Sequence, residues 1–198
     1  MHQGQICMIA NRIVVEDAVY NEFVEKFVAR TRKLVVGKRD AADCLIGPIV
    51  NRDQFEGIME MIAKAKDQGA TCALGGEPDG LVIPPHVFTD VADDNCLVTD
   101  EIFGPVAALH AFDSEEEMHQ LVHQAPYGLA AYIFGDEERA MKWARRFEVG
   151  ATKINGVTVT SLNPEAPRSA WRRFSSAPSS ATRWASGMST SGPTVTRT

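Results

Sequence analysis

Short β-prone runs and amphipathic helical stretches alternate along residues 12–155, and this order restricts the possible folds more than any other feature of the chain. Strands are expected at 12–15, 71–74, 81–83, 87–91, 105–112, 129–134 and 151–155. Helices are expected from Asp17 onward, over 53–68, after Ser114 and after Asp136, because apolar residues recur there every three or four positions. Strands and helices that alternate in this way predict an α/β domain, a layered sheet with flanking helices.

The expected helix ends carry their own local signals. Asp17, Ser114 and Asp136 stand where a side chain can cap the first turn of a helix. Gly69 and Gly150 stand where glycine commonly ends one.

Size and charge exclude several classes of protein. With 198 residues, 44% hydrophobic and 23% charged, the chain suits one sizeable globular domain. Its net charge of −6 argues against a nucleic-acid partner, which needs a basic face. No apolar run approaches the roughly 20 residues needed to cross a bilayer, and the first residues do not resemble a signal peptide. We therefore expect no membrane association and a cytoplasmic protein.

The last 31 residues, 168–198, differ in composition from the rest of the chain. They contain eight Ser, five Thr and five Arg but no Asp, Glu, Lys, Leu or Ile. Such a segment cannot bury much apolar surface, which predicts a disordered tail. Translation in a shifted frame is the alternative that we favour, because GC-rich coding DNA read out of frame yields Ser, Arg, Ala, Pro and Thr. The domain is accordingly expected to end at residue 167.

No metal site is expected from the sequence. The cysteines at 7, 44, 72 and 96 lack the spacing of a metal knuckle, so reduced thiols are the expected state. His119 and His123 are four residues apart on a predicted helix and could offer two ligands on one face. No third ligand lies near in sequence, and we interpret both as solvated helix surface.

Two segments carry residues suited to chemistry. Cys7 follows Gly4, and glycine near a nucleophile allows a tight turn and close approach of a substrate. Glu101 lies two residues before Phe103, ahead of a Gly-Pro pair. A carboxylate can bind ribose hydroxyls, and an aromatic ring can pack on a flat heterocycle. Taken singly, a cysteine is more often a small buried residue, and a Glu and a Phe are more often surface and core.

The two segments together resemble the aldehyde dehydrogenases. The matching stretches are Gly-Gln-Ile-Cys at 4–7, Asn-Arg-Ile-Val-Val at 11–15, Glu-Ile-Phe-Gly-Pro at 101–105, Tyr-Gly-Leu at 127–129, and Gly-x-x-x-Ile-Asn-Gly at 150–156. They occur in the order that the family shows, and the resemblance runs from residue 1 to residue 167. It stops where the composition changes: the family continues with Phe-Gly-Gly, and this chain continues with Arg-Ser-Ala-Trp.

The resemblance implies a fold and specific roles. It implies an incomplete aldehyde dehydrogenase catalytic domain with an irregular tail. Cys7 would attack a small aldehyde, hydride would pass to NAD or NADP, and water would release the acid from a Cys7 thioester. Glu101 would hold the nicotinamide ribose, Phe103 would flank the ring, and the Cys7 N–H would stabilise the oxyanion. The residues at 2–7 resemble family members that act on aromatic aldehydes of the benzaldehyde type.

In the family, the water-activating glutamate, the second oxyanion donor and nearly all of the dinucleotide-binding fold precede the cysteine. The isolated chain is therefore expected to be inactive as a dehydrogenase, and its self-association is doubtful although the parent enzyme would be a homo-oligomer. Two alternatives remain open. One is cofactor-independent esterase activity at Cys7, and the other is a non-catalytic remnant of a disrupted gene.

Overall fold

The computed structural model describes residues 2–37, 44–125 and 128–157, and the predicted tail at 168–198 lies outside them. In chain order the elements are η1 (His2–Gly4), β1 (Arg12–Glu16), α1 (Asp17–Thr31), α2 (Arg52–Asp67), β2 (Thr71–Leu74), β3 (His86–Thr89), α3 (Cys96–Thr99), β4 (Val106–Phe112), α4 (Glu115–His123), β5 (Ala130–Ile133), α5 (Glu137–Ala144) and β6 (Ala151–Ile154). Sheets with helices packed on them confirm the predicted α/β class. No helix of the described ranges is long and apolar enough to cross a membrane.

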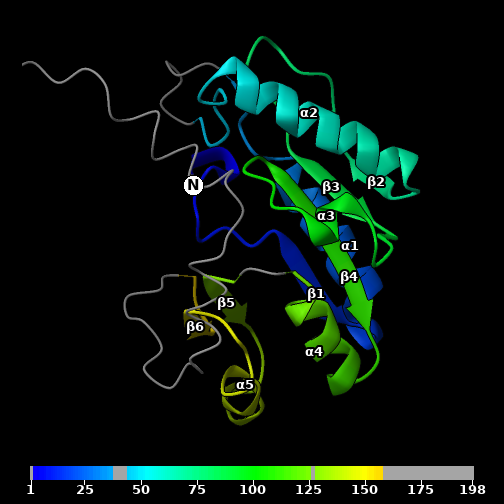
Figure 1. The fold of residues 1–198 in the computed structure, drawn as a ribbon, viewed down its shortest axis with the longest axis vertical. Coiled ribbons are helices and arrows are strands. Elements are labelled where there is room, and N and C mark those ends of the chain that lie inside the picture. Colours follow the sequence, from blue (N-terminus) through cyan, green and yellow to red (C-terminus); the bar gives the residue numbers. More distant parts are fainter. Residues whose placement is uncertain (1, 38–43, 126–127, 158–198) are drawn as a thin grey trace, which may run out of the picture.

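The strands form two groups. One sheet has the order β1-β4-β3-β2, in which β1, β4 and β3 are parallel and β2 runs antiparallel to β3. A separate parallel pair joins β5 to β6. In Figure 1, α1 lies behind the four-stranded sheet, α2 and α3 lie in front of it, and the β5–β6 pair with α5 lies to one side of β1. The N-terminal segment runs between these two parts.

Each part has its own hydrophobic core. The first core packs α2 and α3 onto one face of β3 and β4, with Ile58, Phe88 and Leu97 almost fully buried. The second core packs α4 and α5 against the end of β4 and the β5–β6 pair, around Trp143 and Phe147. Burial of side chains this large supplies most of the favourable free energy of folding.

Local helix signals at Ser114, Asp136 and Gly69 predicted helix ends correctly, whereas Gly150 does not end a helix, because α5 already ends at Ala144. Ser114 accepts a hydrogen bond from the Glu117 amide at 3.2 Å, and Asp136 accepts one from the Arg139 amide at 2.9 Å. Gly69 has φ +91° and ends α2, as expected for a glycine in the left-handed region. The expected cap at Asp17 is wrong: Glu16 is the N-cap residue, without a side-chain hydrogen bond to the helix, and Asp17 lies inside the first turn.

The expected strand at 81–83 is also wrong. Only an isolated bridge, Asp79 to Val82, occurs there, although Ile83 is fully buried. Pro84 and Pro85 follow directly. Because proline has no N–H to donate to a ladder, these two residues prevent the run from continuing as a strand.

Candidate active site

Cys7 lies on a tight turn that presents its thiol to solvent. The Ile9 amide donates a hydrogen bond to the Ile6 carbonyl at 3.1 Å, which places Cys7 and Met8 at the two central positions. The Cys7 side chain is exposed, whereas Cys96 is buried and Cys44 and Cys72 are partly buried. An exposed thiol on a turn is accessible to a substrate. The alternative interpretation, that Cys7 is a small buried residue, does not fit this exposure.

Gly4 brings this turn against the segment that carries Glu101 and Phe103. A Cβ built on Gly4 would lie 2.0 Å from the carbonyl oxygen of Gly104, and Gly4 has φ +77°. Both the contact and the backbone conformation therefore require glycine. The sequence suggested that Gly4 allows a substrate to approach. In the structure, the absence of a side chain at Gly4 instead allows the backbone of Gly104 to pack against it.

Two further hydrogen bonds attach these segments to α2. The Gln5 side-chain carbonyl accepts from the Val50 amide at 2.9 Å, just ahead of the helix. The Gln54 amide group, from the first turn of α2, donates to the Phe103 carbonyl at 3.3 Å. The start of α2 thus supports both the Cys7 segment and the Phe103 segment.

Glu101 and Phe103 flank the buried Ile102 in the segment between α3 and β4. Ile102, between them, is buried in the first core, while Glu101 and Phe103 are both half-buried. Burial raises the pKa of the Glu101 carboxyl. Among the described residues, no hydrogen bond or ion pair reaches that carboxyl group.

The position of this segment depends on close packing between Gly104 and Ile58. A Cβ on Gly104 would lie 2.8 Å from the Ile58 Cδ1 atom, and Ile58 is only 1% exposed. We expect Gly104→Ala to destabilise the fold by about 1–3 kcal/mol through overpacking. Ile58→Val removes the Cδ1 atom and is expected to cost about 1 kcal/mol alone.

A double-mutant cycle measured by urea unfolding checks this packing. The double variant should be more stable than the sum of the two single changes predicts, since Ile58→Val opens the space that the added methyl group at position 104 needs. Additive effects would mean that the two side chains do not compete for this space.

The two histidines of α4 correct one prediction. His119 is 6% exposed and packs edge-on against Phe147, with ring centroids 5.5 Å apart. The Nδ1 atom of His123 lies 2.7 Å from the His119 carbonyl, and its Nε2 atom accepts from the Glu148 amide at 3.0 Å. His119 is therefore buried against Phe147 of the second core, and His123 is half-buried beside it, so the prediction of solvated surface is wrong for His119 and only partly right for His123. Within residues 2–37, 44–125 and 128–157, no three potential ligands come together as a metal site would require.

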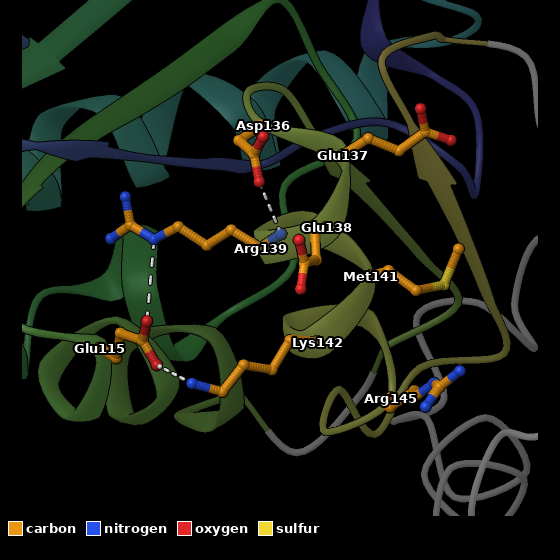
Figure 2. A pocket seen from close by; sticks show the side chains of 8 residues that line it. All are labelled: Glu115, Asp136, Glu137, Glu138, Arg139, Met141, Lys142 and Arg145. Atoms are coloured by element: carbon orange, nitrogen blue, oxygen red, sulfur yellow. Dashed lines mark hydrogen bonds and ion pairs between the residues drawn. The ribbon is translucent and has the colours of Figure 1, made fainter.

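A shallow hollow lies between α4 and α5 and is lined by residues of neither candidate segment (Figure 2). Three of its charged side chains pair with one another: Glu115 contacts Arg139 at 3.7 Å and Lys142 at 3.6 Å. The groups are exposed, and such pairs contribute little to stability. The hollow contains no nucleophile and neither of the candidate cofactor-binding residues, so it is not part of the candidate site.

Tyr132 is one contact of the Cys7 turn that sequence reasoning missed. Its hydroxyl, on β5, donates to the Met8 carbonyl at 2.9 Å. No local signal identifies this role, because a tyrosine within the β-prone run 129–134 is ordinary in a strand.

Known proteins match nearly all of the described chain. The sequence model for the "Aldehyde dehydrogenase family" matches residues 1–169. Vanillin dehydrogenase of Corynebacterium glutamicum is 39% identical over 160 residues, which are 80% of this chain and 33% of that protein.

Solved structures agree with the sequence match. The crystal structure of an NAD-dependent benzaldehyde dehydrogenase from C. glutamicum superposes with a TM-score of 0.76 at 35% identity, covering 87% of this chain and 36% of that one. Betaine aldehyde dehydrogenase from Staphylococcus aureus, in complex with NAD+, gives a TM-score of 0.76 at 30% identity, with 79% and 33% covered. The chain thus spans about a third of the length of the relatives it matches.

Proposed function

Because the chain belongs to the aldehyde dehydrogenase family, we propose that it supplies the nucleophile and part of the cofactor site for NAD(P)-dependent oxidation of an aldehyde to a carboxylic acid. One observation carries the proposal: the contact between Gly4 and Gly104 joins the exposed Cys7 turn to the segment of Glu101 and Phe103.

Cys7 acts as the nucleophile in this proposal. Its sulfur forms a bond to the aldehyde carbon, and the carbonyl oxygen becomes an oxyanion that accepts a hydrogen bond from the Cys7 N–H. Loss of hydride from the resulting thiohemiacetal, to the acceptor that a bound nicotinamide cofactor would supply, would leave a thioester on Cys7. Water then cleaves the carbon–sulfur bond, which releases the carboxylic acid and regenerates the thiol.

Glu101 and Phe103 are suited to a nicotinamide dinucleotide. A half-buried carboxyl group without a partner among the described residues can accept hydrogen bonds from ribose hydroxyls. A half-buried ring two residues further along can pack against a flat heterocycle. A bound cofactor, NAD or NADP, would supply the hydride acceptor, and Glu101 and Phe103 would bind and orient it.

Aromatic aldehydes are the proposed substrate class. The matches to a vanillin dehydrogenase and to a benzaldehyde dehydrogenase support it, since both names denote aromatic aldehydes. We further propose that the remaining groups needed for hydride transfer lie in the parts of these relatives that this chain does not match. On that basis the 198-residue chain alone should not reduce NAD+ or NADP+ in the presence of benzaldehyde.

Acylation by p-nitrophenyl acetate tests the nucleophile directly. We expect Cys7 to form its thioester at least about tenfold faster than Cys44 or Cys72, because its side chain is exposed and the other two are partly buried. Mass spectrometry of the digested chain gives the rate at each cysteine, and Cys44 and Cys72 serve as internal controls. Equal rates at the three cysteines would remove the basis for the proposal.

The same reaction distinguishes a single acylation of Cys7 from the alternative of cofactor-independent esterase activity. A nucleophile that lacks a base to activate water should release one nitrophenolate per chain and then stop. Continued release that disappears in Cys7→Ala would instead establish cofactor-independent esterase activity.

A further inference from the structure

We infer that Tyr132 is a positioning residue for Cys7: its hydroxyl fixes the peptide plane that closes the turn on which the thiol stands. The inference rests on the proposed role of Cys7 as the nucleophile. It assigns to β5, from the second core, a direct part in the site formed by the N-terminal segment.

The geometry of one peptide unit carries the argument. The Met8 carbonyl and the Ile9 N–H belong to the same planar peptide group. Tyr132 donates to that carbonyl at 2.9 Å, and the N–H at the other end closes the turn by donating to the Ile6 carbonyl at 3.1 Å. The hydrogen bond to the Met8 oxygen therefore also fixes the direction of the Ile9 N–H. Because that N–H closes the turn, the same hydrogen bond restricts the conformation of Cys7 within the turn.

Tyr132 also interacts electrostatically with Cys7. Burial, and next the negative charge of an ionised Cys7, raise the pKa of the Tyr132 phenol. With a raised pKa, the Tyr132 phenol is protonated at neutral pH and its hydroxyl can donate a hydrogen bond. A negative charge on Cys7 favours the protonated phenol further. The contact spans 124 positions of the chain and joins the two parts of the molecule seen in Figure 1.

Two reactions of Cys7 distinguish orientation from simple tethering. In acylation by p-nitrophenyl acetate, the thiolate attacks the acetyl carbon, a sulfur–carbon bond forms, and nitrophenolate leaves after an oxyanion intermediate. That oxyanion needs the Cys7 N–H in a particular direction. In alkylation by iodoacetamide, the thiolate displaces iodide from a methylene carbon, and no oxyanion forms. Orientation of the turn should therefore affect acylation more than alkylation.

Tyr132→Phe is the test variant, and Tyr20→Phe is its matched control. Tyr20 likewise donates its hydroxyl to a backbone carbonyl, that of Leu109 at 3.1 Å, on the α1 side of the sheet. Both changes delete one phenol-to-carbonyl hydrogen bond. The full chain is used, and the tryptic peptide of residues 1–12 reports Cys7 without any other cysteine.

We expect Tyr132→Phe to slow Cys7 acylation roughly threefold to tenfold, as loss of one hydrogen bond would. Alkylation should change less than about twofold, and Tyr20→Phe should alter neither rate. Equal slowing of both reactions would reduce Tyr132 to a structural tether and overturn the inference, as would unchanged acylation. If Cys7 of the unsubstituted chain is acylated no faster than Cys44, the proposed nucleophile itself fails, and this inference fails with it.

Discussion

Gly4→Ala is expected to destabilise the folded chain by about 2–5 kcal/mol, the sum of two costs. A residue with a Cβ at φ +77° costs about 1–2 kcal/mol. The new atom would also lie 2.0 Å from the Gly104 carbonyl oxygen, and forcing backbone apart in a packed region costs about 1–3 kcal/mol. Urea unfolding followed by circular dichroism measures the change. Since Gly104 follows Phe103 directly, the same substitution should separate the Cys7 turn from the segment of Glu101 and Phe103.

Gly80→Ala provides the matched control. Gly80 has φ +62°, and nothing lies within 4 Å of a Cβ built there. Its substitution therefore tests backbone strain without a clash and should cost only about 1–2 kcal/mol. If Gly4→Ala is no more destabilising than Gly80→Ala, the close contact with Gly104 is not present in solution.

Acid is expected to destabilise the fold through His110. This side chain, on β4, is 6% exposed, and its Nε2 atom has no hydrogen-bond partner among the described residues. Burial, helped by the nearby Arg12 guanidinium and opposed by Asp93, lowers the pKa of His110 from 6.5 to about 4. The folded chain therefore holds this imidazole neutral at a pH where the unfolded chain protonates it.

The direction follows from proton linkage. The unfolded state binds the extra proton, so the contribution of His110 to stability is complete above pH 6.5 and is lost as the pH falls towards about 4. About 2 kcal/mol should be lost between roughly pH 7.5 and 5, from the difference between the two pKa values. Urea unfolding at a series of pH values measures this slope.

His110→Leu isolates the imidazole from the carboxylates, which titrate in both proteins. The variant should be within about 1 kcal/mol of the original at about pH 7.5, because an apolar side chain replaces an unpaired polar one. At about pH 5 it should be the more stable of the two. Identical pH slopes would show that His110 does not remain neutral in the folded chain.

Local sequence signals predicted α1, α2, α4, α5 and most strands, but not α3 or the end of α5 at Ala144. The caps at Ser114 and Asp136 and the end of α2 at Gly69 were predictable because each signal and its effect lie within one helical turn. The strand predicted at 81–83 failed because two prolines outweigh an apolar run. The cap predicted at Asp17 failed by one residue, which is the usual uncertainty of a helix end.

The candidate residues could also be identified from the sequence, but the contacts that bring their segments together could not. Motif order alone singled out Cys7, Glu101 and Phe103 and indicated the family. Nothing in the sequence says that Gly4 contacts Gly104, one hundred positions away, or that Tyr132 bonds to Met8.

The burial of His110 and His119 was likewise decided by tertiary packing. Both residues are polar, and a helix or strand pattern by itself places His119 on either the solvent side or the core side. Phe147 covers His119 only once α5 and β6 are folded against α4. Periodicity and capping act between residues a few positions apart, so the sequence alone predicted most of the elements, and its motifs singled out Cys7 as the candidate nucleophile. Contacts between distant segments depend on how complete elements pack, and only that packing decided which groups surround the thiol and which histidines remain neutral.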